Sequence, residues 1–350
     1  MSVTIDDIAK LTGFSITTVS RVLNKKAKKY RISKKTADII NKKAIELGYR
    51  PNDIARSLRL KKTNLVGLIV PDISNPFFSY ITSVIQNLAS EYGYSLIVAN
   101  TNEDIEKEIE NIEIFRRKGV DGYIIMPVGI KHEHLEELIK YNKALVLLDR
   151  NISVLNANCV VVNNYLGSYE ATEYLIRMGH KRIGVIQGLP NTSTNNERLL
   201  GYRNALADNG IPIDETLIMG NDFRSENGYL STIKLMELKE PPTVIFAFSD
   251  LITLGTIKAC YEKGYRIPDD VSIIAFDDFE FAPFLQTPIT VIEQPKYLMA
   301  EYAIKLLIEN MRNNNPNLSK RKIVLSPKLI IRNSVKKLNE LNFINAKVVY

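Results

Sequence analysis

Acidic and basic side chains directly follow two of the apolar segments that alternate along this chain. Asp149 and Arg150 come after one short apolar run, and Asp277 comes after another. Carboxylate and guanidinium groups are planar and charged, so each can bond several hydroxyl groups at once. Phe77 and Phe78 offer aromatic faces on which the C–H surface of a sugar can pack. These residue types predict a site for a polyhydroxy ligand such as a sugar.

The same carboxylates allow a second interpretation, because Asp149 and Asp277 could be the acid pair of a glycoside hydrolase. No other motif supports an enzyme, since the sequence has neither a G-x-x-x-x-G-K-[ST] phosphate loop nor a G-x-S-x-G nucleophile turn. His132 and His134 are two residues apart, unlike the i,i+4 pair of a helical zinc site, so we expect them on a solvated face. His180 falls in a turn and is expected to be structural. We therefore expect no catalytic residue and no metal site.

Positive charge is concentrated at the start of the chain. Residues 1–62 hold 16 Lys and Arg against 5 Asp and Glu, whereas the remainder holds 30 against 34. A basic arm on an otherwise ordinary domain is typical of a nucleic-acid-binding protein.

The first 12 residues have the pattern of a short capped helix. Thr4 is a suitable N-cap, and Asp6 and Asp7 stand in the first turn, where the helix dipole favours negative charge. Ile5, Ile8 and Leu11 are expected to form its apolar face.

Two more helices are predicted after this one, which makes a helix-turn-helix. Gly13 supplies the turn, Ser15 caps a second helix through Leu23, and Ser33 caps a third that ends before Gly48. On the second helix the side chains expected inside are Val19, Val22 and Leu23, and those left outside are Ile16, Thr17, Ser20 and Arg21. Outward side chains at the start of such a helix can reach base edges in the major groove of DNA. Residues 53–60 are a further short helical candidate, followed by a linker.

From residue 65 onward, short apolar strands alternate with amphipathic helices. Strands are predicted at 66–70, 95–99, 122–126, 144–148, 159–162, 182–187, 217–219, 244–248 and 272–276, and helices at 78–92, 106–118, 167–178, 197–209, 225–238 and 251–263. This alternation predicts an α/β protein with parallel sheets covered on both faces. Two successive runs of about five units indicate two doubly wound lobes, with a ligand cleft between them.

Composition limits the class and the compartment. The chain has 350 residues, 45% hydrophobic and 24% charged, which is typical of a globular protein with more than one domain. No apolar run approaches a membrane span, and the acidic start does not resemble a signal peptide. Cys159 and Cys260 form no disulfide framework, so we expect a reducing cytoplasm and no membrane partner.

Taken in order, these segments resemble the LacI/GalR family of bacterial transcription regulators. The matching stretches are 4–24, 48–60, 67–78, 119–126, 179–184, 196–206, 248–255, 267–278, 292–295 and 331–334. The resemblance implies a helix-turn-helix headpiece at 1–50, a hinge helix and linker at 51–62, and a core at 63–340 similar to periplasmic sugar-binding proteins. The chain would cross between the lobes near Asn163, Val291 and Val324, so the N-lobe would hold about 63–162 and 291–323, and the C-lobe about 163–290 and 324–340.

The resemblance also assigns the contacts with DNA. Arg21 and Thr17 take base-reading positions, and Leu58 aligns with the leucine that a pair of hinge helices inserts into a minor-groove step. One headpiece contacts few bases, so a homodimer on palindromic operator DNA is expected. The full set of expected DNA contacts is Thr4, Ser15, Ile16, Thr17, Thr18, Arg21, Asn24, Lys29, Tyr49, Asn52, Ala55, Arg56, Leu58 and Arg59.

For the cleft, the residues resemble those of ribose-binding proteins and ribose repressors. The expected effector-binding set is Asn75, Phe77, Phe78, Asp149, Arg150, Arg198, Phe223, Ser249, Asp277 and Gln294. Ser249 departs from the pattern, because that pocket has asparagine there, and the change could shift preference to another pentose or a hexose. Apart from such a monosaccharide effector, no cofactor is expected.

The expected function is a repressor of a sugar-utilisation operon, controlled allosterically. The sugar would close the cleft and so order or melt the hinge helices at 53–60; induction and corepression both fit this scheme. One alternative is a catabolite-control regulator whose corepressor is a phosphorylated carrier protein or a sugar phosphate. Another is a sugar-binding transport protein, which the basic N-terminal segment opposes. The tail at 336–350 lacks sustained heptads, so a tetramer-forming coiled coil is not expected.

Overall fold

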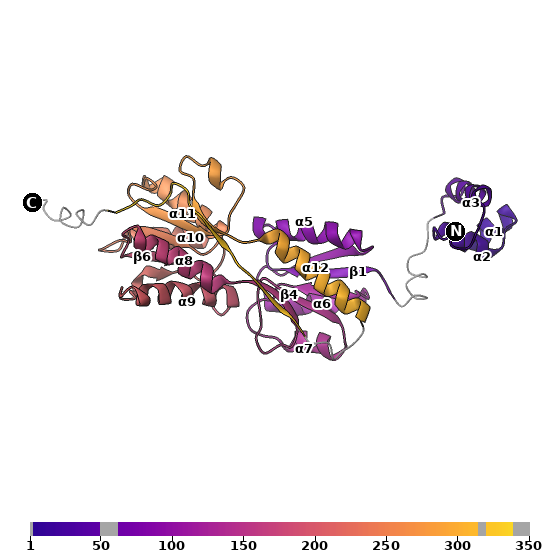
Figure 1. Cartoon of the computed structure of the whole chain (residues 1–350), viewed down its shortest axis with the longest axis horizontal. Helices are drawn as coiled ribbons and strands as arrows, with labels where there is room; N and C mark the ends of the chain where they lie inside the picture. Colours follow the sequence, from indigo (N-terminus) through magenta and orange to yellow (C-terminus); the bar gives the residue numbers. More distant parts are fainter. Residues whose placement is uncertain (1–2, 50–61, 314–319, 339–350) are drawn as a thin grey trace, which may run out of the picture. The chain divides into compact units, whose positions relative to one another are not determined.

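The computed structural model describes residues 3–49, 62–313 and 320–338, and it divides into an N-terminal unit up to Thr63 and a core from Asn64 (Figure 1). In residues 3–49, the N-terminal unit has three helices, α1 (Ile5–Thr12), α2 (Ile16–Leu23) and α3 (Lys34–Glu46). Each begins at a hydroxyl N-cap: the side chains of Thr4, Ser15 and Ser33 accept backbone N–H groups of the first turn. Thr4 and Asp7 form a reciprocal capping box.

A small apolar cluster holds these helices together. Ile8, Val19 and Ile40, one from each helix, are fully buried. Leu11 was expected on this face but is 60% exposed. Six residues of α-helix turn through about 600°, so a residue at i+6 lies about 120° from the first. Ala9 occupies the inner face instead.

The core contains two sheets. The first, in the N-lobe, has the order β11-β5-β4-β3-β1-β2, and all of its pairings are parallel. Its strands are β1 (Leu65–Val70), β2 (Ser95–Asn100), β3 (Gly122–Ile125), β4 (Ala144–Leu148), β5 (Asn158–Val162) and β11 (Lys322–Leu325).

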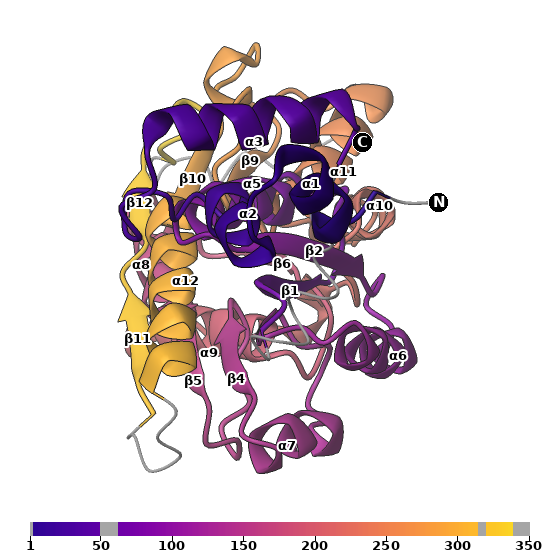
Figure 2. The same ribbon diagram turned by 90° about the vertical axis from the view of Figure 1, so that its right-hand side faces the viewer.

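Helices cover both faces of this sheet. α5 (Pro76–Glu91) and α12 (Lys296–Asn313) share one apolar cluster with alternate strand residues, and α6 (Ile105–Arg117) and α7 (Glu133–Lys140) share another with the residues between them. Figure 2 shows α12 and α6 on opposite sides of the strands. Burial on both faces explains why these strands are almost wholly apolar.

The second sheet, in the C-lobe, repeats this plan with the order β12-β10-β9-β8-β6-β7. Its strands are β6 (Ile183–Ile186), β7 (Ile218–Met219), β8 (Val244–Ala247), β9 (Ser272–Phe276), β10 (Thr290–Glu293) and β12 (Lys328–Ile330). Its helices are α8 (Asn164–Arg177), α9 (Ser193–Asp208), α10 (Ser225–Met236) and α11 (Asp250–Lys263), with short 3-10 turns at Glu215–Leu217 and Ala282–Phe284. Only β12 runs antiparallel to its neighbour among the described strands.

The chain passes between the two sheets three times. The last passage lies within the long segment that crosses the core in Figure 1. The first change of sheet lies at Asn163, the second between Glu293 and Lys296, and the third between Leu325 and Lys328. The second and third changes of sheet lie a few residues after the positions expected near Val291 and Val324. Both residues lie inside strands: Val291 pairs with Ala275 in the C-lobe sheet, and Val324 pairs with Val161 in the N-lobe sheet.

In the C-lobe, α10 and α11 pack against each other at two glycines. A Cβ at Gly255 would overlap the carbonyl oxygen of Ser225, and one at Gly228 would overlap that of Ile252. Both obstacles are backbone atoms of the partner helix, so no side-chain rotation relieves them.

We expect Gly255→Ala to lower the free energy of unfolding by about 1–3 kcal/mol, the usual cost of an overpacked interior. Urea unfolding followed by circular dichroism measures the change. Lys258→Ala, on the exposed face of α11, is the control and should change it by less than about 0.5 kcal/mol. Equal stability of the Gly255→Ala variant and the unaltered protein would show that the two helices can move apart at no cost.

Candidate functional site

A cavity of about 30 Å³ lies between the two lobes at the carboxyl ends of their strands. The structure brings together in its walls all ten residues expected in the cleft, and it adds Thr194. The lining residues are Asn75, Phe77, Phe78, Asp149, Arg150, Thr194, Arg198, Phe223, Ser249, Asp277 and Gln294. The side chains nearly fill the space, because a single water needs about 10–15 Å³.

Asp149 and Asp277 occupy equivalent places in the two lobes. Asp149 directly follows β4 and Asp277 directly follows β9, each the third strand from one edge of its six-stranded sheet. Both have left-handed backbone conformations, with φ of 66° and 78°. Asp is one of the few non-glycine residues that adopt this conformation readily. The turn directs each chain away from its sheet and leaves a carboxylate at the strand end.

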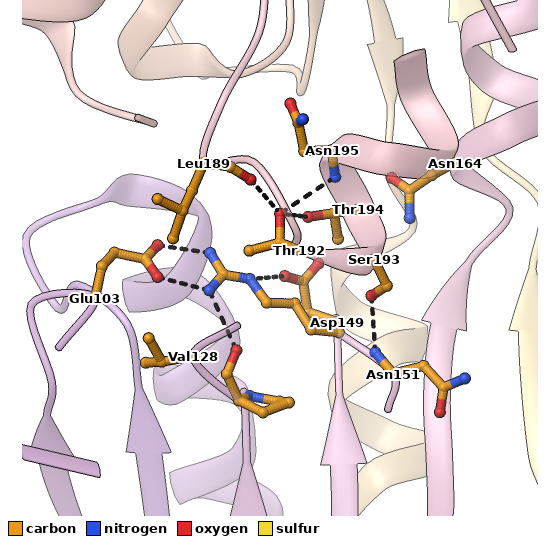
Figure 3. A network of polar contacts seen from close by, with 12 residues as sticks. Glu103, Val128, Asp149, Asn151, Asn164, Leu189, Thr192, Ser193, Thr194 and Asn195 are labelled. Carbon is orange, nitrogen blue, oxygen red and sulfur yellow. Dashed lines mark hydrogen bonds and ion pairs between the residues drawn. The ribbon is translucent and has the colours of Figure 1, made fainter. Parts of the chain in front are cut away.

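Arg150 is 2% exposed and is held by groups of its own lobe. Its two terminal nitrogens donate to the two carboxylate oxygens of Glu103, each at 2.6 Å, and Nη1 also donates to the carbonyl of Pro127 at 3.2 Å. Its Nε lies 3.8 Å from Oδ2 of Asp149, too far for a hydrogen bond. Figure 3 shows the side chains of Glu103 and Asp149.

Arg198 is 3% exposed and is fixed by the other lobe. Its Nε donates to Oδ1 of Asn164 at 2.8 Å, Nη1 donates to the carbonyl of Phe248, and the guanidinium lies 3.7 Å from the centre of the Phe276 ring. Burial lowers the pKa of Arg198, against the opposing charge of Asp277.

Three phenylalanines supply apolar walls. The rings of Phe77 and Phe78 meet edge to face at 5.2 Å. Phe223 lies 5.6 Å from the Arg150 guanidinium and packs so closely on Gly188 that no Cβ would fit there. Asn75 begins α5, where its Oδ1 accepts the N–H of Phe77 at 2.8 Å. Asn75 therefore fixes the turn that brings both rings to the cavity.

Gln294 and Ser249 complete the polar wall. Nε2 of Gln294 donates to Oδ1 of Asp277, while its Oε1 has no hydrogen-bond partner among the described residues. Ser249, which stands where the ribose pocket has asparagine, caps α11, because its Oγ accepts the N–H of Ile252 at 3.2 Å. In this chain Ser249 therefore has a structural role as the N-cap of α11.

Two buried carboxyl groups, those of Asp149 and Asp250, are protonated more readily than free ones. Burial raises the pKa of Asp149 to about 6, against the lowering effects of Arg150 and Arg198. Burial, followed by the charge of Asp277, raises the pKa of the neighbouring Asp250 to about 7. Asp250 also accepts a long bond of 3.4 Å from Nδ2 of Asn75, which joins the two lobes.

Sequence reasoning missed two of these residues. Thr194 stands in the first turn of α9, which begins four residues before the predicted helix at 197–209; the signal was Thr192, a hydroxyl N-cap. Glu103 follows the strand predicted at 95–99, at the same edge of the sheet as the expected site residues. Its role depends on Arg150, 47 residues away, which the local pattern does not reveal.

Two of the histidines differ from each other in their surroundings. His134 does not lie on the solvated face expected for it: its side chain is 9% exposed and its Nε2 lies 2.6 Å from Oε1 of the fully buried Glu108. The sequence does not show that α6 and α7 pack together there. His180 is buried between Thr243 and the carbonyl of Lys336, and burial lowers its pKa to about 4.

The headpiece presents the start of α2 to solvent. Ile16 is 54% exposed, Thr17 is exposed, and the guanidinium of Arg21 lies 3.9 Å from the centre of the Tyr30 ring. Ser15 and Thr18 bond each other at 2.9 Å, and Asn24 donates to the Ser20 carbonyl. Thr4 caps α1, Lys29 is exposed, and Tyr49 packs on the apolar cluster. The hinge candidates Asn52, Ala55, Arg56, Leu58 and Arg59 lie outside the described residues.

Comparison with known proteins identifies both parts of the chain. Residues 4–52 match the model of bacterial regulatory proteins of the lacI family, and residues 172–335 match a periplasmic binding protein-like domain. The regulator DegA of Bacillus subtilis is 37% identical over 97% of this chain and 100% of its own length. The chain belongs to the LacI family. Its architecture is the family's: a helix-turn-helix unit and a core of two doubly wound lobes.

Two further LacI-family proteins show the range of relatives. The repressor PurR of Vibrio atlanticus is 33% identical over 96% of this chain and 99% of its own length. A regulator from Enterococcus faecium with bound ribose superposes with a TM-score of 0.71, is 27% identical, and covers 79% of this chain and 100% of its own. This protein is accordingly a DNA-binding transcriptional regulator and not an enzyme. Among the described residues, no helix is long and apolar enough to cross a membrane, and no group of three or more His, Cys, Asp or Glu could hold a metal ion.

The raised pKa of Asp149 predicts a pH-dependent cost to stability. Between pH 4 and pH 6 the folded protein holds a proton that the unfolded chain releases, so the stability falls as the pH rises through this range. Asp149→Asn removes this effect. We expect the free energy of unfolding of the variant, relative to that of the unaltered protein, to rise by about 1 kcal/mol between pH 5 and pH 7.5.

Urea unfolding at both pH values measures this difference, and Asp250 is common to both proteins, so its own titration cancels. Asp269→Asn, which changes an exposed carboxyl group that does not line the cavity, is the control and should show no such trend. If this difference in free energy of unfolding falls with rising pH, the folded protein stabilises the ionised form of Asp149 and the prediction is wrong.

Proposed function

We propose that this LacI-family protein represses a sugar-utilisation operon and that a monosaccharide bound in the interlobe cavity controls its affinity for operator DNA. The observation that carries the proposal is the cavity itself. It combines three aromatic rings with two buried guanidinium groups and two carboxylates at strand ends, which is the chemistry a sugar requires. Ribose is the leading candidate, because the residue types resemble those of ribose pockets and a related regulator from Enterococcus faecium binds ribose.

On the DNA side, we propose that α2 enters the major groove. Arg21 can donate two hydrogen bonds to guanine, Thr17 can contact a base or a thymine methyl, and Ile16 adds apolar contact. A homodimer would place two such helices on a palindromic operator, with the hinge residues 53–60 between headpiece and core. A regulator of this kind would work in the cytoplasm.

The coupling between the two sites would pass through the relation of the lobes. Hydrogen bonds that join the lobes beside the cavity include Asn75 to Asp250 at 3.4 Å, and the N–H of Asn151 to Oγ of Ser193 at 2.9 Å. The second of these contacts is drawn in Figure 3. A sugar that favours one spacing of the lobes shifts the dimer between two states and so orders or melts the hinge helices. Linkage makes the effect reciprocal, so a sugar that weakens operator binding must itself bind the operator complex less tightly.

Catabolite control by a phosphorylated carrier protein or a sugar phosphate is the second candidate. The buried Arg198, oriented toward the sugar-type cavity by Asn164 and Phe248, favours a small ligand in the cleft over a protein corepressor. A transport protein would have no use for the helix-turn-helix unit.

We expect Arg21→Ala to reduce the preference for operator over random DNA by tenfold or more, since one bidentate base contact is worth about 1–3 kcal/mol. Weak, salt-sensitive binding to both DNAs should persist. Fluorescence anisotropy on the two duplexes measures the ratio. Lys42→Ala removes the same charge from the exposed face of α3 and should leave the ratio unchanged. A uniform loss on both duplexes would assign Arg21 to phosphate contact only.

For Arg198→Ala we expect operator binding without a sugar response. Truncating one partner of a buried charged hydrogen bond costs about 2–5 kcal/mol, so the sugar affinity should fall by 30-fold or more. A thermal-shift screen of free sugars, sugar phosphates and purines identifies the effector first, and calorimetry then compares the variants. Arg203→Ala, on the outer side of the same helix, is the matched control. A normal response of Arg198→Ala to the effector would place the binding site elsewhere.

A further inference from the structure

The surroundings of the interlobe cavity carry more negative than positive charge. Carboxyl groups of Glu103, Asp149, Asp250 and Asp277 stand around the guanidinium groups of Arg150 and Arg198. The ammonium group of Lys296 also acts on Asp250, so four carboxyl groups stand against three cations. An anionic ligand would add to this excess in a site from which water is largely removed, where repulsion between like charges is strong.

The hydrogen-bonding groups of the cavity that remain unused include both acceptors and donors. Oε1 of Gln294 has no hydrogen-bond partner among the described residues. No hydrogen bond from these residues reaches the carboxylate of Asp149 either. Nε of Arg150 is a buried donor without a partner, and among the described residues only Nε and Nη1 of the Arg198 guanidinium donate, which leaves its Nη2 for a ligand. A ligand must therefore both donate and accept hydrogen bonds. A sugar hydroxyl both donates and accepts, whereas a phosphate at neutral pH is mainly an acceptor.

Glu103 occupies the groups that would otherwise bind an anion. Its two oxygens take both terminal nitrogens of Arg150 at 2.6 Å, which is the fork-to-fork geometry that a phosphate would need for itself. Glu103 also lines an adjoining cavity of about 250 Å³ that shares Asn75, Phe78 and Phe223 with the first. Asp72 and Asp222 line that cavity too, against one cation, Arg224. A phosphate group extending from the sugar site would thus meet carboxylates on its way.

We propose that Glu103 is a specificity residue that excludes anionic effectors, so that the cavity takes an unphosphorylated polyhydroxy ligand and rejects its phosphate ester. The inference rests on the proposed sugar response and narrows its ligand class. It also separates the two regulator types considered above, because a sugar-phosphate corepressor is the ligand that this arrangement disfavours.

The first test uses the full-length protein and matched pairs, D-ribose with D-ribose 5-phosphate and D-glucose with D-glucose 6-phosphate, in calorimetric titrations. The free sugar of at least one pair should bind at least 100-fold more tightly than its phosphate. Equal or tighter binding of the phosphates would overturn the inference and leave a sugar-responsive regulator. If no member of either pair binds, both the inference and the sugar response are overturned.

The second test changes the charge of Glu103. Glu103→Gln keeps the shape and one acceptor toward Arg150 but removes the negative charge, so the ratio of phosphate to sugar dissociation constants should narrow at least tenfold. Glu103→Asp retains the charge, so the ratio of phosphate to sugar dissociation constants should stay as high as in the unaltered protein. Glu106→Gln makes the same charge change on the nearby surface, where Glu106 pairs with Lys131 at 3.4 Å, and should have no effect on the ratio. If Glu103→Gln lowers the affinities for the sugar and its phosphate equally, Glu103 has only a structural role. If the variant does not fold, the titrations of the unaltered protein with the matched pairs still test the inference.

Discussion

The burial of two guanidinium groups between the sheets is the constraint on which the rest of the core depends. A charge taken out of water must keep partners at fixed positions, because an unpaired one costs several kcal/mol. Arg150 has the carboxylate of Glu103 within the N-lobe, and Arg198 has the side chain of Asn164 and the carbonyl of Phe248 within the C-lobe. Each lobe therefore satisfies its own cation. The lobes can separate to admit a ligand without leaving either charge unpartnered, and the ligand need only bridge what lies between them.

The matching architecture of the two sheets places the opposing carboxylates. β4 and β9 hold the same position in their sheets, and each is followed at once by an aspartate in a left-handed turn. In parallel sheets the strand ends gather at one edge, where side chains can converge without disturbing the apolar interior. The position of the site is thus a property of the fold, whereas its preference for one ligand depends on the few side chains at that edge, such as Ser249 and Glu103.

Local patterns in the sequence were enough for the elements and for cavity residues that directly follow strands, such as Asp149, Arg150 and Asp277. Arg198, Phe223, Ser249 and Gln294 were predicted from the resemblance to ribose pockets. Features that depend on distant contacts were not predictable in this way. The pair of His134 with Glu108 joins side chains 26 residues apart, and the Glu103–Arg150 pair spans 47. The second and third lobe crossings lie a few residues after the expected positions, because the motif boundaries do not show where β10 and β11 end. Leu11 was misplaced because three-residue spacing drifts off a helix face within two turns.

Neither lobe is a continuous stretch of chain, and this has a consequence for synthesis on the ribosome. α12 covers a face of the first sheet and β11 forms its edge, yet both follow the whole set of second-lobe helices. About 150 residues separate the end of β5 from the end of α12. At roughly 5–20 residues per second, the nascent first lobe waits on the order of 10–30 s with the apolar side chains that α12 will cover still open to solvent. Because β11 and β12 are made within a few residues of each other, the two lobes finish folding almost together, and the ligand cavity first exists only when nearly the entire protein has been translated.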